Sequence, residues 1–177
     1  SSLGMYDWST SFTVATRLSI DSSMSNGTIG ILQDNGMVFG VELNKANGTD
    51  YRLRFRDSAF HLASTDINAF PVDQMFDLAV SYDGNTGAVA FYIDGVAVNV
   101  TGSVDAGDGG SMQTRLGTGF KGSYDNLAIY HSVLTANDVA DLHATIDDHP
   151  FDIVPLLEWA DRDEAAGAEA PPEPEGE

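Results

Sequence analysis

Short apolar runs that alternate with polar residues fill the chain between residues 12 and 131. Within each run the apolar side chains fall at every second position, which is the period of a β-strand with one buried face. Turn residues separate the runs, and Asn35-Gly36 and Asp94-Gly95 are pairs typical of type I′ hairpin turns. The expected strands cover residues 12–20, 28–33, 37–43, 51–56, 60–63, 76–82, 88–94, 96–101 and 114–119, together with the opening stretch. So many short strands predict an all-β fold, a two-sheet jelly-roll sandwich.

One short C-terminal helix is predicted after the strands. Thr135 and Asp138 form a weak capping box, and Val139, Leu142 and Ile146 follow at helical spacing. We expect this helix to run to about residue 144 and to pack on the edge of the sandwich.

The sequence beyond the helix changes character twice. Residues 149–160 are apolar but interrupted by prolines, and residues 161–177 are rich in Pro, Ala and Glu, a composition with little reason to fold alone. We therefore expect a sandwich domain over 1–148, an apolar docking segment over 149–160 and an acidic tail over 161–177.

The charge balance narrows the partners. The chain has 27 Asp and Glu against 8 Lys and Arg, a net charge of -19. Such a surface repels nucleic acid, and no apolar run is long enough for membrane insertion. The excess of acid suits a saline environment, with an ordinary acidic extracellular protein as the alternative. The chain has no cysteine, which excludes disulfides and thiolate chemistry.

Three segments carry a family resemblance: FTVATRL from Phe12, FDLAVSYDGNTGAVAFYIDG from Phe76 and LGTGFKGSYDNLAIYHSVLTANDVADL from Leu116. Their order and spacing resemble laminin-G-like, concanavalin A-like lectin/glucanase domains over residues 12–142. Arg17 and Met75-Phe76 stand where many members carry Trp. The family's first strand, upstream of residue 3, is missing, so we expect either a trimmed chain or residues 151–154 at that edge. The resemblance implies the sandwich, which hosts lectins, adhesion modules, polysaccharide-cleaving enzymes and spacers.

A catalytic pair is not evident. Glycoside hydrolysis needs two facing carboxylates, and Glu42 is the only Glu before residue 158 and has no acidic neighbour two positions away. The histidines lie apart in sequence. We therefore expect a non-catalytic module.

Asp125 alternates with Leu127 and Ile129, so its carboxylate is expected to point toward the core and to need a partner. The resemblance implies a structural calcium ion at this aspartate, or backbone N–H groups that it caps. Calcium prefers hard oxygen ligands, and Asp7 is the best second carboxylate. The ion and the backbone donors both stay open.

A row of arginines is the most individual feature. In YRLRFR, the side chains of Arg52, Arg54 and Arg56 share one face of a strand, and the apolar residues between them share the other. A hairpin over residues 42–52 would pair Glu42 with Arg52 and leave the other two guanidinium groups without a cross-strand partner. Because guanidinium binds carboxylate or sulfate through paired hydrogen bonds, this face suits an anionic glycan.

Other residues could join the glycan site. Arg17 and Arg115 are further cations, and Tyr92, off the core face, could stack on a sugar ring. In the alternative interpretation, the arginines only neutralise neighbouring aspartates and cover apolar surface with their stems. The sequence thus predicts a binding or adhesion module for a glycan or surface polysaccharide on a secreted, cell-surface or virion protein. A purely structural module, docked into a larger assembly through residues 150–159, is the second hypothesis, and a divergent polysaccharide-active enzyme is the third.

Overall fold

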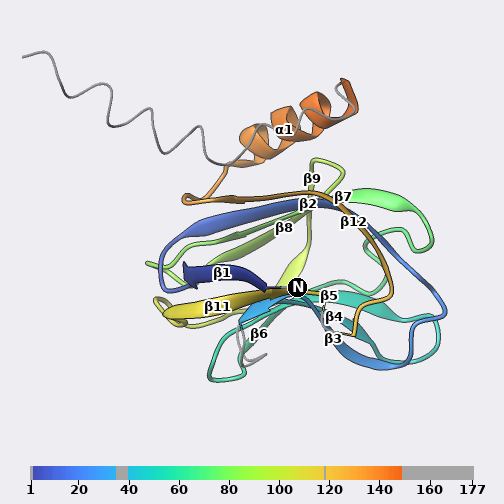
Figure 1. The fold of residues 1–177 in the computed structure, drawn as a ribbon, viewed down its shortest axis with the longest axis horizontal. Coiled ribbons are helices and arrows are strands. Elements are labelled where there is room, and N and C mark those ends of the chain that lie inside the picture. Colours follow the sequence, from blue (N-terminus) through green and yellow to red (C-terminus); the bar gives the residue numbers. More distant parts are fainter. Residues whose placement is uncertain (1, 35–39, 118, 149–177) are drawn as a thin grey trace, which may run out of the picture.

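Two antiparallel sheets are stacked face to face in the computed structural model, which describes residues 2–34, 40–117 and 119–148 (Figure 1). The seven-stranded sheet has the order β1 (Ser2–Asp7), β11 (Ser111–Leu116), β3 (Gly27–Asp34), β4 (Gly40–Lys45), β5 (Tyr51–Arg56), β6 (Leu62–Thr65) and β10 (Val100–Gly102). The five-stranded sheet has the order β12 (Gly122–Tyr130), β2 (Phe12–Ile20), β7 (Met75–Tyr82), β8 (Val89–Ile93) and β9 (Val96–Val98). The predicted two-sheet sandwich is confirmed.

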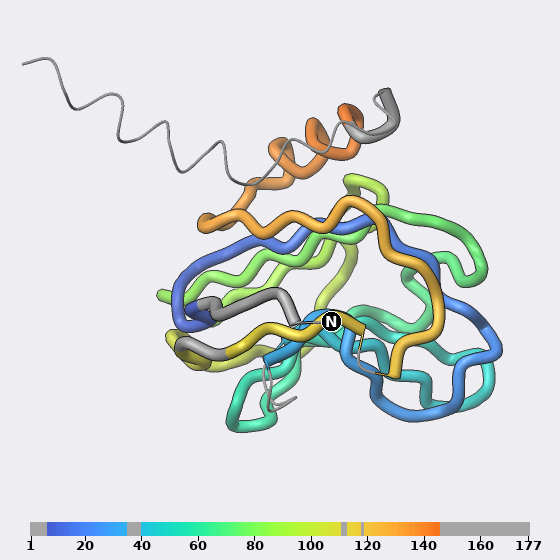
Figure 2. The backbone as a smooth tube through the Cα atoms, viewed as in Figure 1, coloured from blue at the N-terminus to red at the C-terminus, as the bar shows by residue number. Residues whose placement is uncertain are grey.

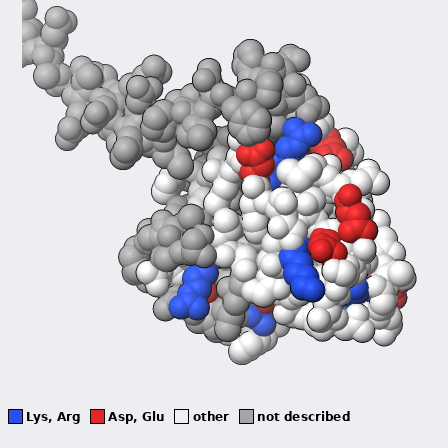
Figure 3. Space-filling model, turned by 45° about the vertical axis from the view of Figure 1, so that its right-hand side comes forward, with Lys and Arg blue, Asp and Glu red and all other residues white. Residues whose placement is uncertain are grey.

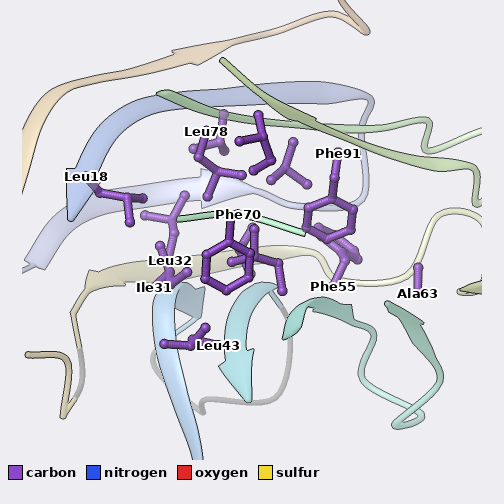
Figure 4. Close-up of a cluster of buried hydrophobic side chains, with 14 of the residues drawn as sticks. Leu18, Ile31, Leu32, Leu43, Phe55, Ala63, Phe70, Leu78 and Phe91 are labelled. Atoms are coloured by element: carbon purple, nitrogen blue, oxygen red, sulfur yellow. The ribbon is translucent and has the colours of Figure 1, made fainter. Parts of the chain in front are cut away.

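The core lies between the two sheets, where alternate residues of both inner faces meet. Figure 4 shows Leu18, Leu78 and Phe91 from the five-stranded sheet pointing toward Leu32 and Phe55 of the other sheet. All of these are nearly or fully buried. Burying such a side chain contributes about 1.5–3 kcal/mol, so the strand alternation is the main determinant of the fold.

The helix α1 (Ala136–Asp148) covers the outer face of the five-stranded sheet (Figure 1). Val139 is 3% exposed and packs with Ala15, Ala79 and Tyr92, which come from three neighbouring strands. The expected capping box is present, because Asp138 accepts a hydrogen bond from the Thr135 amide. Because Val139 contacts three neighbouring strands, the helix lies over the face of the sheet rather than on its edge, where it had been expected. It also continues four residues beyond the expected end.

The predicted strand over residues 96–101 is divided between the sheets. β9 pairs with β8, whereas β10 pairs with β6 on the opposite layer. Figure 2 shows this yellow-green stretch crossing from one layer to the other. Asn99, at the crossing, donates to the Asp66 carboxylate. The prediction of one continuous strand was wrong because alternation alone does not reveal a change of sheet.

β12 contains a bulge between Asp125 and Ala128, where Asn126 adopts a φ of 50°. On the two sides of the bulge, Asp125 pairs with Arg17 and Ala128 pairs with Ala15. Paired residues share a face, and Ala15 lies on the outer face beneath α1. Asp125 therefore lies on the outer face, half-buried. The expectation that its carboxylate points toward the core was wrong, because the extra residue reverses the alternation.

Candidate functional site

The arginine row stands on the outer face of the seven-stranded sheet. Arg52, Arg54 and Arg56 are half-buried, while Tyr51, Leu53 and Phe55 between them enter the core, as predicted. The hairpin register differs by two residues from the expected one. A five-residue loop closes it, with the Ala46 amide donating to the Asp50 carbonyl at 3.0 Å.

The observed register changes the partner of the buried carboxylate. Glu42 lies opposite Arg54, and Arg52 lies opposite Asn44. The Arg56 guanidinium reaches Glu42 diagonally, with Nη2 2.7 Å from Oε1. The expected Glu42–Arg52 pair was therefore wrong, and the carboxylate neutralises Arg56 instead.

Glu42 is held in a buried polar network. It is 1% exposed, and Gln33 Nε2 donates to its Oε1 at 2.9 Å. The Gln33 amide folds over Gly30, where any Cβ would overlap it. Burial raises the pKa of Glu42, and the charges of Arg56 and Arg54 oppose that rise. The network fixes one guanidinium, and on this face the described residues of β4 and β5 carry three cations and one carboxylate.

The other two arginines are less engaged. Arg54 Nε is buried and has no hydrogen-bond partner among the described residues, and burial lowers the pKa of Arg54. For Arg52 the described residues provide no ion pair within 4.0 Å. Because Arg54 Nε itself is buried, only the accessible part of each half-buried guanidinium could donate to an oxyanion at this face.

The remaining predicted ligand residues do not join the row. Arg17 belongs to β2, in the other sheet, with Nε 3.8 Å from Asp77 Oδ1. Tyr92 lies off the core face, as predicted, but α1 covers it and leaves it 6% exposed. A ring so covered cannot stack on a sugar, so its predicted role was wrong. Arg115 is exposed and lies opposite Gln33 on the same face, separated from Arg56 by the two strands β3 and β4.

An exposed aromatic ring, which the sequence did not single out, lies beside the row. Phe60 is 64% exposed, and the Arg56 guanidinium carbon lies 5.4 Å from its ring centroid. It belongs to the turn between β5 and β6, where its backbone φ is 68°. Phe60 was expected at the start of a strand, but β6 begins two residues later, at Leu62. The sequence signal for this position is the three-residue loop 58–60, which lacks the glycine that such a loop normally carries at its last position.

The Asp57 carboxylate organises that turn. It is fully buried and accepts hydrogen bonds from the amides of His61 and Asp105, at 2.7 and 2.9 Å. Its Oδ2 also lies 2.9 Å from His61 Nδ1. Burial would raise the pKa of Asp57, but these hydrogen bonds lower it. The hydrogen bond and charge of Asp57 raise the pKa of His61.

Two groups of side chains in the described part of the chain could hold a metal ion: Asp57, His61 and Asp105, and Asp77, Asp94 and His143. Neither includes the predicted calcium ligands. Asp125 belongs to the five-stranded sheet and Asp7 to the other, where Asp7 Oδ1 accepts hydrogen bonds from the Ser9 amide and hydroxyl. The described residues add no third ligand to Asp125 and Asp7, so calcium there stays a prediction.

On the face in Figure 3, the Lys and Arg side chains stand singly among acidic and neutral residues. None of the helices in the described segments is long and apolar enough to cross a membrane.

Comparison with known proteins gives one family and several similar folds. The family model described as "Concanavalin A-like lectin/glucanases superfamily" matches residues 2–140. No curated protein sequence matches the chain.

Among solved structures, the binding domain of botulinum neurotoxin serotype D is 12% identical, with a TM-score of 0.58 over 77% of this chain and 37% of that one. A structure of botulinum neurotoxin type C, whose cell entry depends on interaction with two ganglioside molecules, is 11% identical, with a TM-score of 0.59 over 79% and 36%. A Trypanosoma rangeli sialidase in complex with 2,3-difluoro-KDN is 16% identical, with a TM-score of 0.57 over 78% and 23%. The chain thus spans well under half of each of these structures, and the likeness shows the shared fold alone.

Proposed function

Because the chain belongs to the concanavalin A-like lectin/glucanases superfamily, we propose that it is a non-catalytic carbohydrate-binding module for glycans that carry acidic groups. The observation that carries the proposal is the arginine row on the outer face of the seven-stranded sheet. Three of the eight cations of a chain with net charge -19 share one strand face, and Glu42 is the single carboxylate that the described residues of β4 set opposite them. Arg52 and Arg54 supply the donors for a carboxylate or sulfate.

Two kinds of support come from outside the row. One of the similar solved structures belongs to a toxin that interacts with gangliosides, and another to a sialidase with a bound sugar analogue. Both proteins interact with sugars, and each contains a region of comparable fold. We extend the binding of acidic sugars to this chain as part of the proposal.

We propose a module without catalytic activity because the surroundings of Glu42 do not suit glycoside hydrolysis. A glycosidase carboxylate must face a second carboxylate across the substrate. Glu42 is 1% exposed, and its register neighbours are Gly30 and Arg54. It is tied to Arg56 and Gln33, which makes it an organising residue of the binding face.

The proposal includes an extracellular, cell-surface or virion location in a saline environment. It also keeps a structural calcium ion at Asp125, for which a chelator should lower the melting temperature of the wild type but not that of Asp125→Asn. The alternative of docking through residues 150–159 concerns a segment outside the described residues.

The test compares the sugar affinities of two variants, each of which lacks one arginine on the outer face of a different sheet. Wild type, Arg52→Gln and Arg17→Gln are titrated by calorimetry with 3′-sialyllactose and an alginate trisaccharide, and with the neutral sugars lactose and laminaritriose. We expect the wild type to prefer the acidic sugars and Arg52→Gln to bind them about tenfold more weakly, because a charge-assisted hydrogen bond contributes about 1.5–3 kcal/mol. Arg17→Gln removes the same charge from the opposite face and should bind like the wild type. Equal losses in the two variants, or no binding by the wild type, would overturn the proposal.

A further inference from the structure

We propose that Phe60 is the aromatic platform on which one pyranose ring of the glycan stacks, at the end of the arginine row. This inference rests on the proposed function and names the shape of its ligand. The ring is 64% exposed and adjoins the row through Arg56, whose guanidinium carbon is 5.4 Å from the ring centroid. A hexose presents a C–H face that packs on an aromatic ring, so this position suits a sugar.

The backbone shows that this residue is held at a cost. The Phe60 amide donates to the Asp57 carbonyl, and the Asp57 amide donates to the His61 carbonyl. Between them lie three residues, the hairpin loop whose last position requires a left-handed backbone and normally carries glycine. Phe60 occupies that position with a φ of 68°. For a bulky aromatic residue this is an outlier, and such residues cluster at functional sites.

The Asp57 carboxylate explains how the strained turn persists. Fully buried at the start of the loop, it accepts hydrogen bonds from the His61 amide at the end of the loop and from the Asp105 amide in the segment between β10 and β11. The bond to His61 holds the two ends of the loop together independently of the Phe60 side chain. The ring itself is therefore free to remain at the surface, where folding gains little from it.

The spacing of the row defines the ligand. Successive arginines on one strand face lie about 7 Å apart, so Arg54 and Arg52 stand about 7 and 13 Å beyond Arg56. Arg56 is already paired with Glu42. The acidic group of the ligand should therefore reach Arg54 or Arg52, one or two sugar units away from the stacked ring. The geometry points to a di- or trisaccharide rather than a single acidic sugar.

The experiment separates the contribution of the Phe60 ring to binding from the effect of its strained backbone on stability. Phe60→Ala removes the ring and keeps a left-handed non-glycine residue, Phe60→Gly removes both, and Phe60→Trp keeps an aromatic face. Val96→Ala, at a residue 67% exposed on β9, controls for the loss of an exposed apolar side chain. Each is titrated with 3′-sialyllactose and with free sialic acid, and its melting temperature is measured.

We expect Phe60→Ala and Phe60→Gly to bind 3′-sialyllactose about tenfold more weakly, with Phe60→Trp and Val96→Ala close to the wild type. Phe60→Gly should melt at a higher temperature than Phe60→Ala. If Arg52→Gln weakens binding while Phe60→Ala does not, the platform is overturned and the proposed function stands. If Phe60→Ala and Phe60→Gly melt alike, the strain argument is overturned. Equal affinity for free sialic acid and 3′-sialyllactose would overturn the predicted length of the ligand.

Discussion

At the scale of single residues, two buried carboxylates organise the outer face of the seven-stranded sheet. Glu42 immobilises one arginine of the row, and Asp57 holds the turn that displays Phe60. Both are nearly inaccessible to solvent, and both are satisfied by nearby donors. The proposed binding surface is thus shaped by acidic residues that a ligand would not touch.

The pair of Asp57 and His61 predicts a pH dependence of stability. The lowered pKa of Asp57 means that its contribution is present above the unfolded value, about 3.9, and is lost as the pH falls. The raised pKa of His61 means that its contribution is full below about 6.5 and is lost as the pH rises through the folded value. The pair should therefore stabilise the fold most between about pH 4 and pH 6.5.

Urea denaturation of the wild type and His61→Gln at pH 5.5 and pH 8.5 measures this effect. The wild type should be the more stable of the two at pH 5.5, and the difference should narrow at pH 8.5. A difference that stays constant between the two pH values would contradict the proposed ion pair.

At the scale of elements, α1 is fastened to the five-stranded sheet by its contact with the β8–β9 turn. The turn is the predicted type I′ hairpin, with Asp94 and Gly95 at φ values of 48° and 76°. His143 lies against it, with Nδ1 2.5 Å from Asp77 Oδ2. A Cβ at Gly95 would come within 3.1 Å of the His143 side chain.

Gly95→Ala should therefore destabilise the protein twice over, through its backbone and through α1. Gly48→Ala is the matched control, because Gly48 also has a positive φ, of 46°, but has nothing within 4 Å of an added Cβ. We expect the control to lose about 1–2 kcal/mol of unfolding free energy, and Gly95→Ala to lose at least about 1 kcal/mol more. Denaturant unfolding measures both. Equal losses would show that His143 does not constrain the turn.

The elements also show where sequence reasoning reaches its limit. The alternation of apolar and polar residues correctly predicted both ends of the strand over 12–20 and the face on which Arg52, Arg54 and Arg56 lie. It could not give the hairpin register, because a shift of two residues preserves every face. It could not reveal the bulge at Asn126, which reversed the orientation of Asp125, or the outer face that α1 covers, which buried Tyr92. Phe60 escaped notice because its position depends on one backbone angle.

At the scale of the whole molecule, salt should affect stability and ligand binding in opposite directions, because the chain is strongly acidic whereas the proposed binding face is basic. The net charge of the chain is -19, and folding brings the acidic side chains of the sandwich closer together, which increases their mutual repulsion. The arginine row is a local exception to this excess of negative charge, and the proposed attraction for an acidic glycan should be strongest at low salt concentration.

Sodium chloride should therefore raise the melting temperature while weakening the binding of acidic sugars. Between 0.05 and 0.5 M the Debye length falls from about 14 to about 4 Å, which screens repulsion between carboxylates and also attraction between Arg52 and a ligand. The melting temperature should rise by a few degrees, while the affinity for 3′-sialyllactose should fall several-fold. Chloride is used because sulfate would strengthen apolar burial in any protein. A melting temperature that falls with salt would mean that favourable ion pairs outweigh the acidic repulsion. Salt-independent binding would mean that stacking on Phe60, rather than the arginines, provides most of the affinity.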